Sequence, residues 1–408
     1  MAFGLEFFAD GLAAAGIRYE RAHPQNVVCM PSRATMLTGQ HVRNHGVWMN
    51  GVPLPAESAT VAGLLHDAGW RTSLFGKAHF EPLLDPFLRF PENRMGVTGD
   101  TDDDIASTSG AITITADRLA LVGGTIASSG ALTLQPNASG ETIGLGNSAT
   151  GDFNLTATEL GLLTNGFSSI TIGKTNSGAV DINAFTFLDP VTIQGGAMTV
   201  TALEAGSLAI TLTSTSTIDE AADDTTVDIT TSGTLSLTAE GAIGATGGSG
   251  PLDLTVGTLV ATTDAGGIFL LESSALIIGG TGVQTTGANA AIEITLTAGD
   301  LTLDDDITAH GSGDVTLTLL TADTAVITSG ADDDIASTSG DITITADRLT
   351  LATGEISSTG ALVLQPNAAE TIGLAGGSGD FNVDATELGL LADGFSLITI
   401  GKTNSGAV

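Results

Sequence analysis

Apolar and polar residues alternate along most of the chain from about residue 98 onward. Runs of Ile, Leu or Val alternating with Thr follow a glycine or small polar residue, as at 110–115, 130–135 and 169–172. This period of two is typical of a β-strand with one buried face. Clusters of Gly, Asn and Asp between the runs provide turns. The pattern predicts many short strands that begin roughly 20 residues apart.

Two β architectures are compatible with this pattern, a parallel β-solenoid and a series of β-sandwiches. Residues 98–408 contain no Trp and no Tyr, and small Ala, Val, Ile, Leu and Thr predominate. Such residues suit the thin interior of a solenoid, where like side chains stack from one rung to the next. We therefore favour an all-β parallel solenoid, with rungs of roughly 20 residues and about fifteen rungs in all.

A long internal duplication underlies the short period. The segment 102–180 recurs nearly unchanged as 332–408, with equivalent residues 228 to 230 positions apart. The chain stops at Val408, which matches Val180 within the first copy. We therefore expect the full-length protein to extend beyond these 408 residues.

The first 97 residues have a different pattern. Residues 61–70 have the apolar spacing of an amphipathic helix that stops at Gly69, and residues 9–16 read as a helix ended by Gly16. Charge also separates the two regions, since residues 1–97 are formally neutral and residues 98–408 account for the whole net charge of -34. We predict two domains, a partial α/β segment at 1–97 and an acidic β-solenoid at 98–408.

Charge and composition also limit the partners and the location. An acidic surface repels nucleic-acid phosphates and anionic lipid, so neither is an expected partner. No apolar stretch reaches the roughly 20 residues of a membrane span. The first ten residues lack the basic start of a signal peptide. A single cysteine, Cys29, excludes an intrachain disulfide and leaves the redox compartment open.

That cysteine lies in a C-x-P-S-R-x-x-x-L-T-G pattern at 29–39, which resembles the signature of the sulfatase family. Further similar segments follow in the family's order: a helix and turn at 9–19, a T-G…H-G-V stretch ending at Val47, and a strand with G-K-x-H at 71–79. The resemblance covers residues 8–85 and is to the formylglycine-dependent (type I) sulfatases.

The resemblance implies a function in sulfuric ester hydrolysis. Cys29 would be converted to formylglycine by a formylglycine-generating enzyme, and the hydrated aldehyde would attack the sulfur of a sulfate ester. Arg33 would hold this nucleophile, while Lys77 and His79 would bind sulfate oxygens. Without the motif, Cys29 would be a buried small hydrophobe, Lys77 a surface lysine and His79 a loop histidine. We expect structural roles for His23, His41, His45 and His66.

The resemblance also implies a divalent cation, calcium or magnesium, held by carboxylates that this sequence does not supply. Family members begin with a strand ending in paired aspartates, and nothing before Ala9 matches it. Family members also have a second metal-binding Asp later in the chain, where this sequence has the acidic repeats instead. We therefore expect these residues by themselves to be catalytically incompetent and the α/β segment to expose apolar faces.

Two other interpretations remain open at this point. The repeats are similar in texture to haemagglutinin-type β-helical repeats of secreted bacterial adhesins, which implies a secreted or cell-surface rod that contacts glycans or surfaces and carries a vestigial head. Alternatively, the join near residue 97 is a gene fusion or an assembly artefact. Acidic triplets at 102–104, 304–306 and 332–334 are either calcium ligands or solvated turn residues.

Overall fold

The computed structural model describes residues 28–49, 52, 54–55, 58–68, 96–99, 104–121, 123–246, 250–287, 289–321, 326–330, 332–403 and 405. The chain divides into two compact units, Met1–Met95 and Gly96–Val408. Within the described ranges, no helix has the length and apolar character that crossing a membrane requires.

Three short helices are described in the first unit: α2 (Cys29–Thr38), α3 (Val42–His45) and α4 (Val61–Asp67). Glycines in the left-handed conformation end α2 and α3, Gly39 at φ 63° and Gly46 at φ 75°. Such C-terminal glycines satisfy the last helical carbonyls without a Cβ clash. The helix expected at 9–16 and the strand expected before the G-K-x-H segment lie outside the described residues.

The helical unit buries little apolar surface among its described residues. Its core cluster consists of Met30, Ala34, Val47 and Leu54. On α4, Leu64 is 62% exposed, so the amphipathic helix expected at 61–70 forms over Val61–Asp67 with apolar side chains in solvent.

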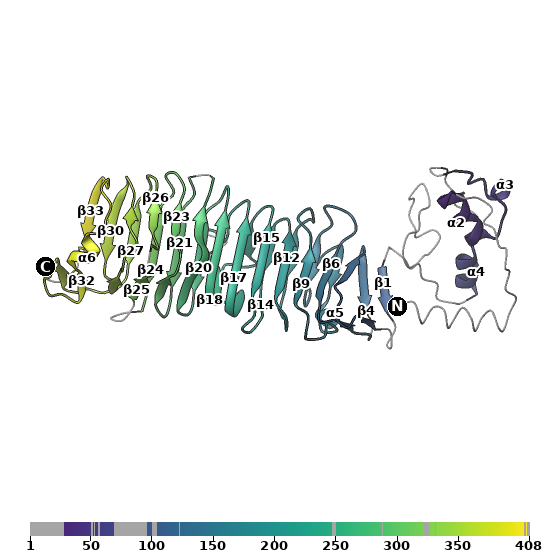
Figure 1. The fold of residues 1–408 in the computed structure, drawn as a ribbon, viewed down its shortest axis with the longest axis horizontal. Helices are drawn as coiled ribbons and strands as arrows, with labels where there is room; N and C mark the ends of the chain where they lie inside the picture. The colour runs from purple at the N-terminus through teal and green to yellow at the C-terminus, as the bar shows by residue number, and fades with distance from the viewer. Residues whose placement is uncertain are drawn as a thin grey trace. The chain divides into compact units, whose positions relative to one another are not determined.

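The second unit is a parallel β-solenoid, as predicted (Figure 1). Its first ladder contains β3 (Ile112–Thr115), β6 (Ala131–Gln135), β9 (Ser169–Gly173), β12 (Val191–Gly195), β15 (Ile210–Ser214), β17 (Ile229–Ala239), β18 (Leu252–Thr263), β20 (Leu276–Thr285), β22 (Leu301–Leu303), β25 (Val326–Ser329) and β28 (Arg348–Thr350). The described strands of this unit pair only in parallel, which excludes the antiparallel sandwich alternative.

A second ladder runs alongside the first. It contains β7 (Ile143–Leu145), β10 (Val180–Ile182), β13 (Met198–Val200), β16 (Ile218–Glu220), the bridging residue Ile243, β19 (Ile268–Glu272), β21 (Ile292–Leu296), β24 (Val315–Leu319), β27 (Ile342–Thr345), β30 (Ala361–Gln365) and β33 (Leu397–Ile400).

Shorter strands and two one-turn helices complete the turns. They are β1 (Gly96–Gly99), β2 (Ile105–Ala106), β4 (Arg118–Leu121), β5 (Ile126–Ala127), β8 (Phe153–Leu155), β11 (Phe185–Thr186), β14 (Leu203–Glu204), β23 (Ile307–Ala309), β26 (Ile335–Ser337), β29 (Ile356–Ser357), β31 (Ile372–Leu374), β32 (Phe381–Val383), α5 (Ala157–Leu160) and α6 (Ala385–Leu388).

Stacked aliphatic side chains form the core of the solenoid. Along the first ladder, Ile172, Ile193 and Leu212 occupy the same register position in successive turns, and all three are fully buried. Each buried aliphatic side chain contributes about 1.5–3 kcal/mol relative to an exposed one. The intervening threonines face outward, which accounts for the period-two alternation in the sequence.

The solenoid has about 11 turns, fewer than the fifteen rungs expected from the sequence. The expected rung of roughly 20 residues was too short. Val191 pairs with Ile210, 19 residues later, whereas Leu132 pairs with Ile170, 38 residues later. That longest turn contains α5, an excursion from the ladder whose N-terminus is capped by a capping box of Thr156 and Glu159.

Glycine and serine together allow the turns to stack closely. Ser128 Oγ donates to Gly110 O at 2.7 Å, and the duplicated pair, Ser358 and Gly340, does the same at 2.6 Å. A Cβ added at Gly130 would lie 2.7 Å from the carbonyl carbon of Gly110. Glycine is therefore required there because the backbone of the preceding turn occupies the space of a side chain.

The two copies of the duplication occupy different ladders. Strand β3 of the first copy lies in the first ladder, but its duplicate in the second copy, β27, lies in the second ladder. The first ladder ends instead at β28, which is the duplicate of β4. The change of ladder occurs across three long strands: β17 has 11 residues, β18 has 12 and β20 has 10. Part of β18 pairs with β19 and the rest with β20, so the corners of the solenoid shift there. Equivalent side chains of the two copies thus point in different directions around the axis.

Candidate functional site

The cysteine motif forms the start of a helix. Val28 is the N-cap of α2 in an extended conformation (φ -89°, ψ 143°), and Cys29 is the first helical residue. Pro31 is tolerated in this first turn, where the backbone N–H groups have no intrahelical acceptor. Ser32 N–H donates to Val28 O at 3.1 Å, which closes the first turn of the helix.

Arg33 lies one helical turn after Cys29. Residues four apart in a helix share a face, so the backbone places Cys29 and Arg33 on the same side of α2. Arg33 is half-buried. Lys77 and His79 lie outside the described residues. The backbone thus places Cys29 and Arg33 one turn apart, and the site roles of all four expected residues stay predictions from the sequence.

His45 joins α2 to α3, which is the structural role expected for it. It is almost fully buried, its Nε2 lies 2.9 Å from Thr35 Oγ1, and Val47 N–H donates to its Nδ1 at 3.2 Å. Because Nδ1 accepts that bond, the neutral ring carries its proton on Nε2 and donates to Thr35. Burial, together with the nearby His41, lowers the pKa of His45 below its usual value.

The described residues around Cys29 do not fit a divalent cation. A calcium or magnesium ion needs several oxygen ligands, typically carboxylates. Among the described residues of the first unit, Asp67 at the end of α4 is the only acidic one. One carboxylate does not make such a site.

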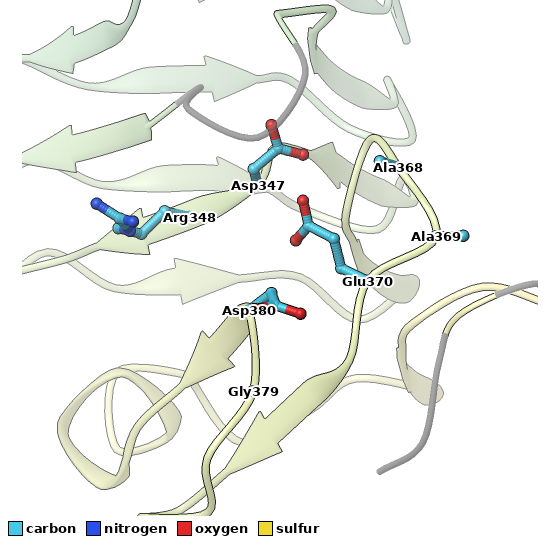
Figure 2. Close-up of a pocket in the computed structure, with 7 residues that line it drawn as sticks. All are labelled: Asp347, Arg348, Ala368, Ala369, Glu370, Gly379 and Asp380. Carbon is cyan, nitrogen blue, oxygen red and sulfur yellow. The ribbon is translucent and has the colours of Figure 1, made fainter.

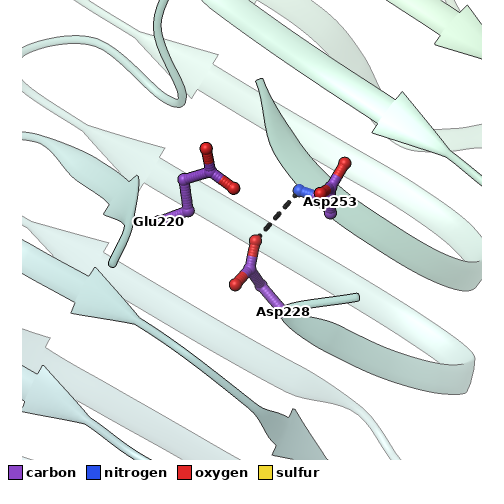
Figure 3. A group of neighbouring side chains, drawn as sticks. All are labelled: Glu220, Asp228 and Asp253. Carbon is purple, nitrogen blue, oxygen red and sulfur yellow. Dashed lines mark hydrogen bonds between the residues drawn. The ribbon is translucent and has the colours of Figure 1, made fainter. Parts of the chain in front are cut away.

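A different acidic group lies in the solenoid, where the sequence had indicated only stacking strands. Glu220 at the end of β16, Asp228 before β17 and Asp253 in β18 each offer a carboxylate oxygen, and these atoms all lie within 4.8 Å of one another. All three residues are buried, and their carboxylates point toward one another (Figure 3). Across the described ranges, no other such group of His, Cys, Asp or Glu is found.

The stacking of successive turns creates this cluster. Asp228 N–H donates to Asp253 O at 2.8 Å, and Asp253 N–H donates to Asp228 Oδ2 at 3.1 Å. Both carboxylate oxygens of Glu220 and both of Asp253 are buried without a hydrogen-bond partner. Burial raises the pKa of Glu220 to about 8, with a further contribution from Asp228, and likewise raises that of Asp253 to about 6. Burial also raises the pKa of Asp228 to about 7.

Sequence reasoning missed these residues because they are 8 and 25 positions apart and match no motif. A weak signal was present in two similar segments, Val227-Asp-Ile-Thr and Leu252-Asp-Leu-Thr. Each places a carboxylate between two apolar residues of a strand run. Because Ile229 pairs with Leu254, the two aspartates fall at the same position of successive turns.

The acidic triplets instead connect successive turns, as far as they are described. Asp104 Oδ1 accepts from Thr125 N–H at 2.7 Å, Asp306 Oδ1 from Asp334 N–H at 2.8 Å, and Asp334 Oδ1 from Glu355 N–H at 2.7 Å. These carboxylates satisfy backbone donors at the turns, a common role for Asp in loops.

A polar pocket of about 570 Å³ lies in the second copy of the duplication (Figure 2). It is lined by Asp347, Arg348, Ala368, Ala369, Glu370, Gly379 and Asp380. The carboxylates of Asp347 and Glu370 face each other there. The first copy has the same residue types at Asp117, Glu141 and Asp152. Burial raises the pKa of Glu141, and nearby Asp117 raises it further. The acidic lining thus belongs to the repeat unit.

Comparisons with known proteins bear on the first unit. The Sulfatase family model matches residues 6–87, which confirms the resemblance found at 8–85. An uncharacterized sulfatase, YidJ, of Escherichia coli is 38% identical over 72 residues, which are 18% of this chain and 14% of the relative.

Other relatives are similar over the same short length. An N-acetylglucosamine-6-O-sulfatase of Bacteroides thetaiotaomicron is 34% identical over 70 residues (17% of this chain, 12% of the relative), and human arylsulfatase G is 36% identical over 75 residues (17% and 14%). The chain thus spans about a seventh of the length of these curated relatives. No solved structure matches the chain. The chain therefore combines a segment that matches the Sulfatase family model at residues 6–87 with a β-solenoid over residues 105–365.

Proposed function

We propose that this is a sulfatase-related protein in which residues 6–87 carry the nucleophile of sulfuric ester hydrolysis and Cys29 is the formylglycine precursor. The observation that carries the proposal is the C-x-P-S-R motif at the start of α2, inside the segment matched by the Sulfatase family model. The hydrated aldehyde of formylglycine would supply an oxygen nucleophile in place of a thiol.

The other motif residues would bind and orient the substrate. Arg33, on the same helical face as Cys29, would hold the nucleophile and balance negative charge. Lys77 and His79 would donate hydrogen bonds to the sulfate oxygens of an ester substrate. These roles follow the family resemblance, and each would be tested by its own substitution.

We further propose that residues 6–87 are not sufficient for turnover. One acidic residue among the described residues of the first unit does not provide a site for a divalent cation. The residues that follow form a solenoid rather than the remainder of a sulfatase-like sheet. Hydrolysis would therefore require carboxylates supplied from outside this segment.

Mass spectrometry of the peptide containing residue 29 tests the first part of this proposal. The full chain would be produced together with a formylglycine-generating enzyme, and we expect an aldehyde at residue 29. The variant Pro31→Ala, which alters the recognition motif, should remain a thiol. Met36→Ala, an exposed change on the same helix, should be modified like the native chain. An unmodified thiol in the native chain would disprove the assignment of Cys29.

A second candidate function is a structural or adhesive one. The described solenoid has a continuous aliphatic core and presents two rotated copies of the same surface. Such a surface would suit repeated contacts with glycans or a cell surface. Glycan-array binding that survives in a Gly96–Val408 fragment would support this function, provided that circular dichroism shows the fragment to be folded.

A further inference from the structure

The buried carboxylates of the solenoid pose an electrostatic problem. Glu220 is 6% exposed and Asp253 is 2% exposed, and none of their four side-chain oxygens has a hydrogen-bond partner. Asp228, also buried, adds a third carboxylate. Burying an ionised carboxylate without a partner is strongly unfavourable, so this charge needs a counter-charge or a proton.

No basic side chain of this region can provide the counter-charge. Between Lys174 and Arg348 the sequence contains no Lys and no Arg, and His310 is the only histidine. The nearby charges that affect the cluster are themselves acidic: Asp223 and Asp224 raise the pKa values of both Glu220 and Asp253. The charge is therefore neutralised either by protons or by a cation from solution.

The geometry of the oxygens suits a metal ion. Three carboxylate oxygens from Glu220, Asp228 and Asp253 lie within 4.8 Å of one another. This spacing fits a shared ion with metal–oxygen distances of about 2.3–2.6 Å, as in calcium sites. Gly250, at φ +63°, lies beside them, and a Cβ added there would collide with Glu220 Oε1 and Asp223 Oδ1. Asp223 therefore adds a fourth carboxylate next to the cluster.

We propose that Glu220, Asp228 and Asp253 bind a calcium ion that connects successive turns of the solenoid, with Asp223 as a further ligand. The all-oxygen, carboxylate-rich donor set selects a hard cation over zinc or copper. Magnesium is less well suited, because it keeps several waters, and the oxygens of Glu220 and Asp253 are enclosed by protein.

Bound calcium would connect three consecutive parts of the fold. Glu220 ends a strand of the second ladder, whereas Asp228 and Asp253 lie at the start of successive long strands, β17 and β18. These are the strands across which the corners of the solenoid shift. The ion would thus stabilise the region where the orientation of the two copies is set.

Calorimetric titration of the chelator-treated full chain with calcium chloride tests the proposal. We expect one site per chain that is tighter than the general counter-ion binding of an acidic protein, and a rise in melting temperature on binding. Glu220→Gln and Asp253→Asn should weaken this site about tenfold or more, since even outer partners of metal ligands cost 10–100-fold. Asp304→Asn, which removes an exposed charge outside the cluster, should leave the site unchanged.

The alternative is that protons alone neutralise the cluster. In that case calcium would bind native chain, Glu220→Gln and Asp253→Asn equally weakly, and the proposal would be overturned. Equal affinity for magnesium would overturn the assignment to calcium. Both variants keep the side-chain shape and remove a buried charge, so in chelator they should melt no lower than the native chain.

Hydrogen exchange on the native chain gives a readout that does not depend on any variant. With calcium, we expect increased protection confined to residues 218–230 and 252–256. Protection that is unchanged, or that rises evenly along the solenoid, would contradict a site at this cluster.

Discussion

The two units of this chain differ in how chemistry and packing are distributed. The helical unit contains the sulfatase motif but, among its described residues, a core of only Met30, Ala34, Val47 and Leu54. The solenoid has a long aliphatic core and no recognisable catalytic motif. In the helical unit, a short sequence motif indicates a chemistry although little core is seen among the described residues. In the solenoid, the repeat indicates the fold, but its polar sites form only when successive turns stack.

The largest expected difference between the units lies in the effect of removing an apolar side chain. Ile193 is fully buried between Ile172 and Leu212 of neighbouring turns, so Ile193→Ala should lower the free energy of unfolding by about 2–5 kcal/mol. Leu64→Ala, at an exposed position of α4, should change it by about 0.5 kcal/mol or less.

The two unfolding transitions can be followed separately. Both tryptophans lie in the first 97 residues, so tryptophan fluorescence in urea reports on the helical unit and far-ultraviolet circular dichroism mainly on the solenoid. Equal effects of the two substitutions would contradict the contrast between a packed and a sparsely packed unit.

The pH dependence of the solenoid should be the next largest effect. Glu272 is fully buried, and burial raises its pKa to about 7 although Val256 N–H and Ser274 donate to it. A raised pKa means that the folded state holds the proton more tightly. The contribution to stability is present below the unfolded value near 4.5 and is lost as the pH rises through about 7. The change is on the order of 3 kcal/mol.

Urea unfolding of the solenoid between pH 4.5 and 8, in chelator, measures this dependence. Glu272→Gln imitates the protonated side chain and should flatten the curve without abolishing it, because Glu220, Asp228 and Asp253 act in the same direction. A solenoid that becomes more stable as the pH rises would show that the folded state favours the ionised form of these carboxylates, which contradicts their raised pKa values.

The helical unit should respond to pH more weakly and in the opposite direction. The pKa of His45 is lowered by burial, so its contribution to stability is present above the unfolded value near 6.5 and is lost as the pH falls below it. Amide exchange in α2 should be slower at pH 8 than at pH 5 after correction for intrinsic rates. His45→Gln should remove this difference, and His41→Gln, which leaves the burial of His45 but removes the smaller contribution of His41, should only reduce it.

The sequence predicted the solenoid well because its signal is local and repeated. Alternation in runs such as 131–135 specifies which side chains face inward, and the duplication shows that whole turns recur. The number of turns was overestimated because excursions such as α5 lengthen a turn without adding a rung. The change of ladder between copies depends on the register of β17 to β20, which no single segment encodes.

The sequence indicated the Cys29 site but not the carboxylate cluster of the solenoid, because only the first is encoded by residues close together in the chain. Cys29 and Arg33 lie four residues apart in one helix, so a short motif contains their relation. Glu220, Asp228 and Asp253 meet only because successive turns stack in register, and their separation in sequence depends on turn length. The roles of Lys77 and His79 rest on the family resemblance alone.

Turnover of an aryl sulfate by the full chain, with the aldehyde at residue 29 verified, tests most directly whether the chemistry of residues 6–87 is complete. Reactions would contain calcium or magnesium, with Cys29→Ala as the reference. We predict an aldehyde at residue 29 but hydrolysis no faster than that of Cys29→Ala, because the described residues around the motif provide no carboxylate site for the cation. Metal-dependent hydrolysis that disappears in Cys29→Ala would contradict this account.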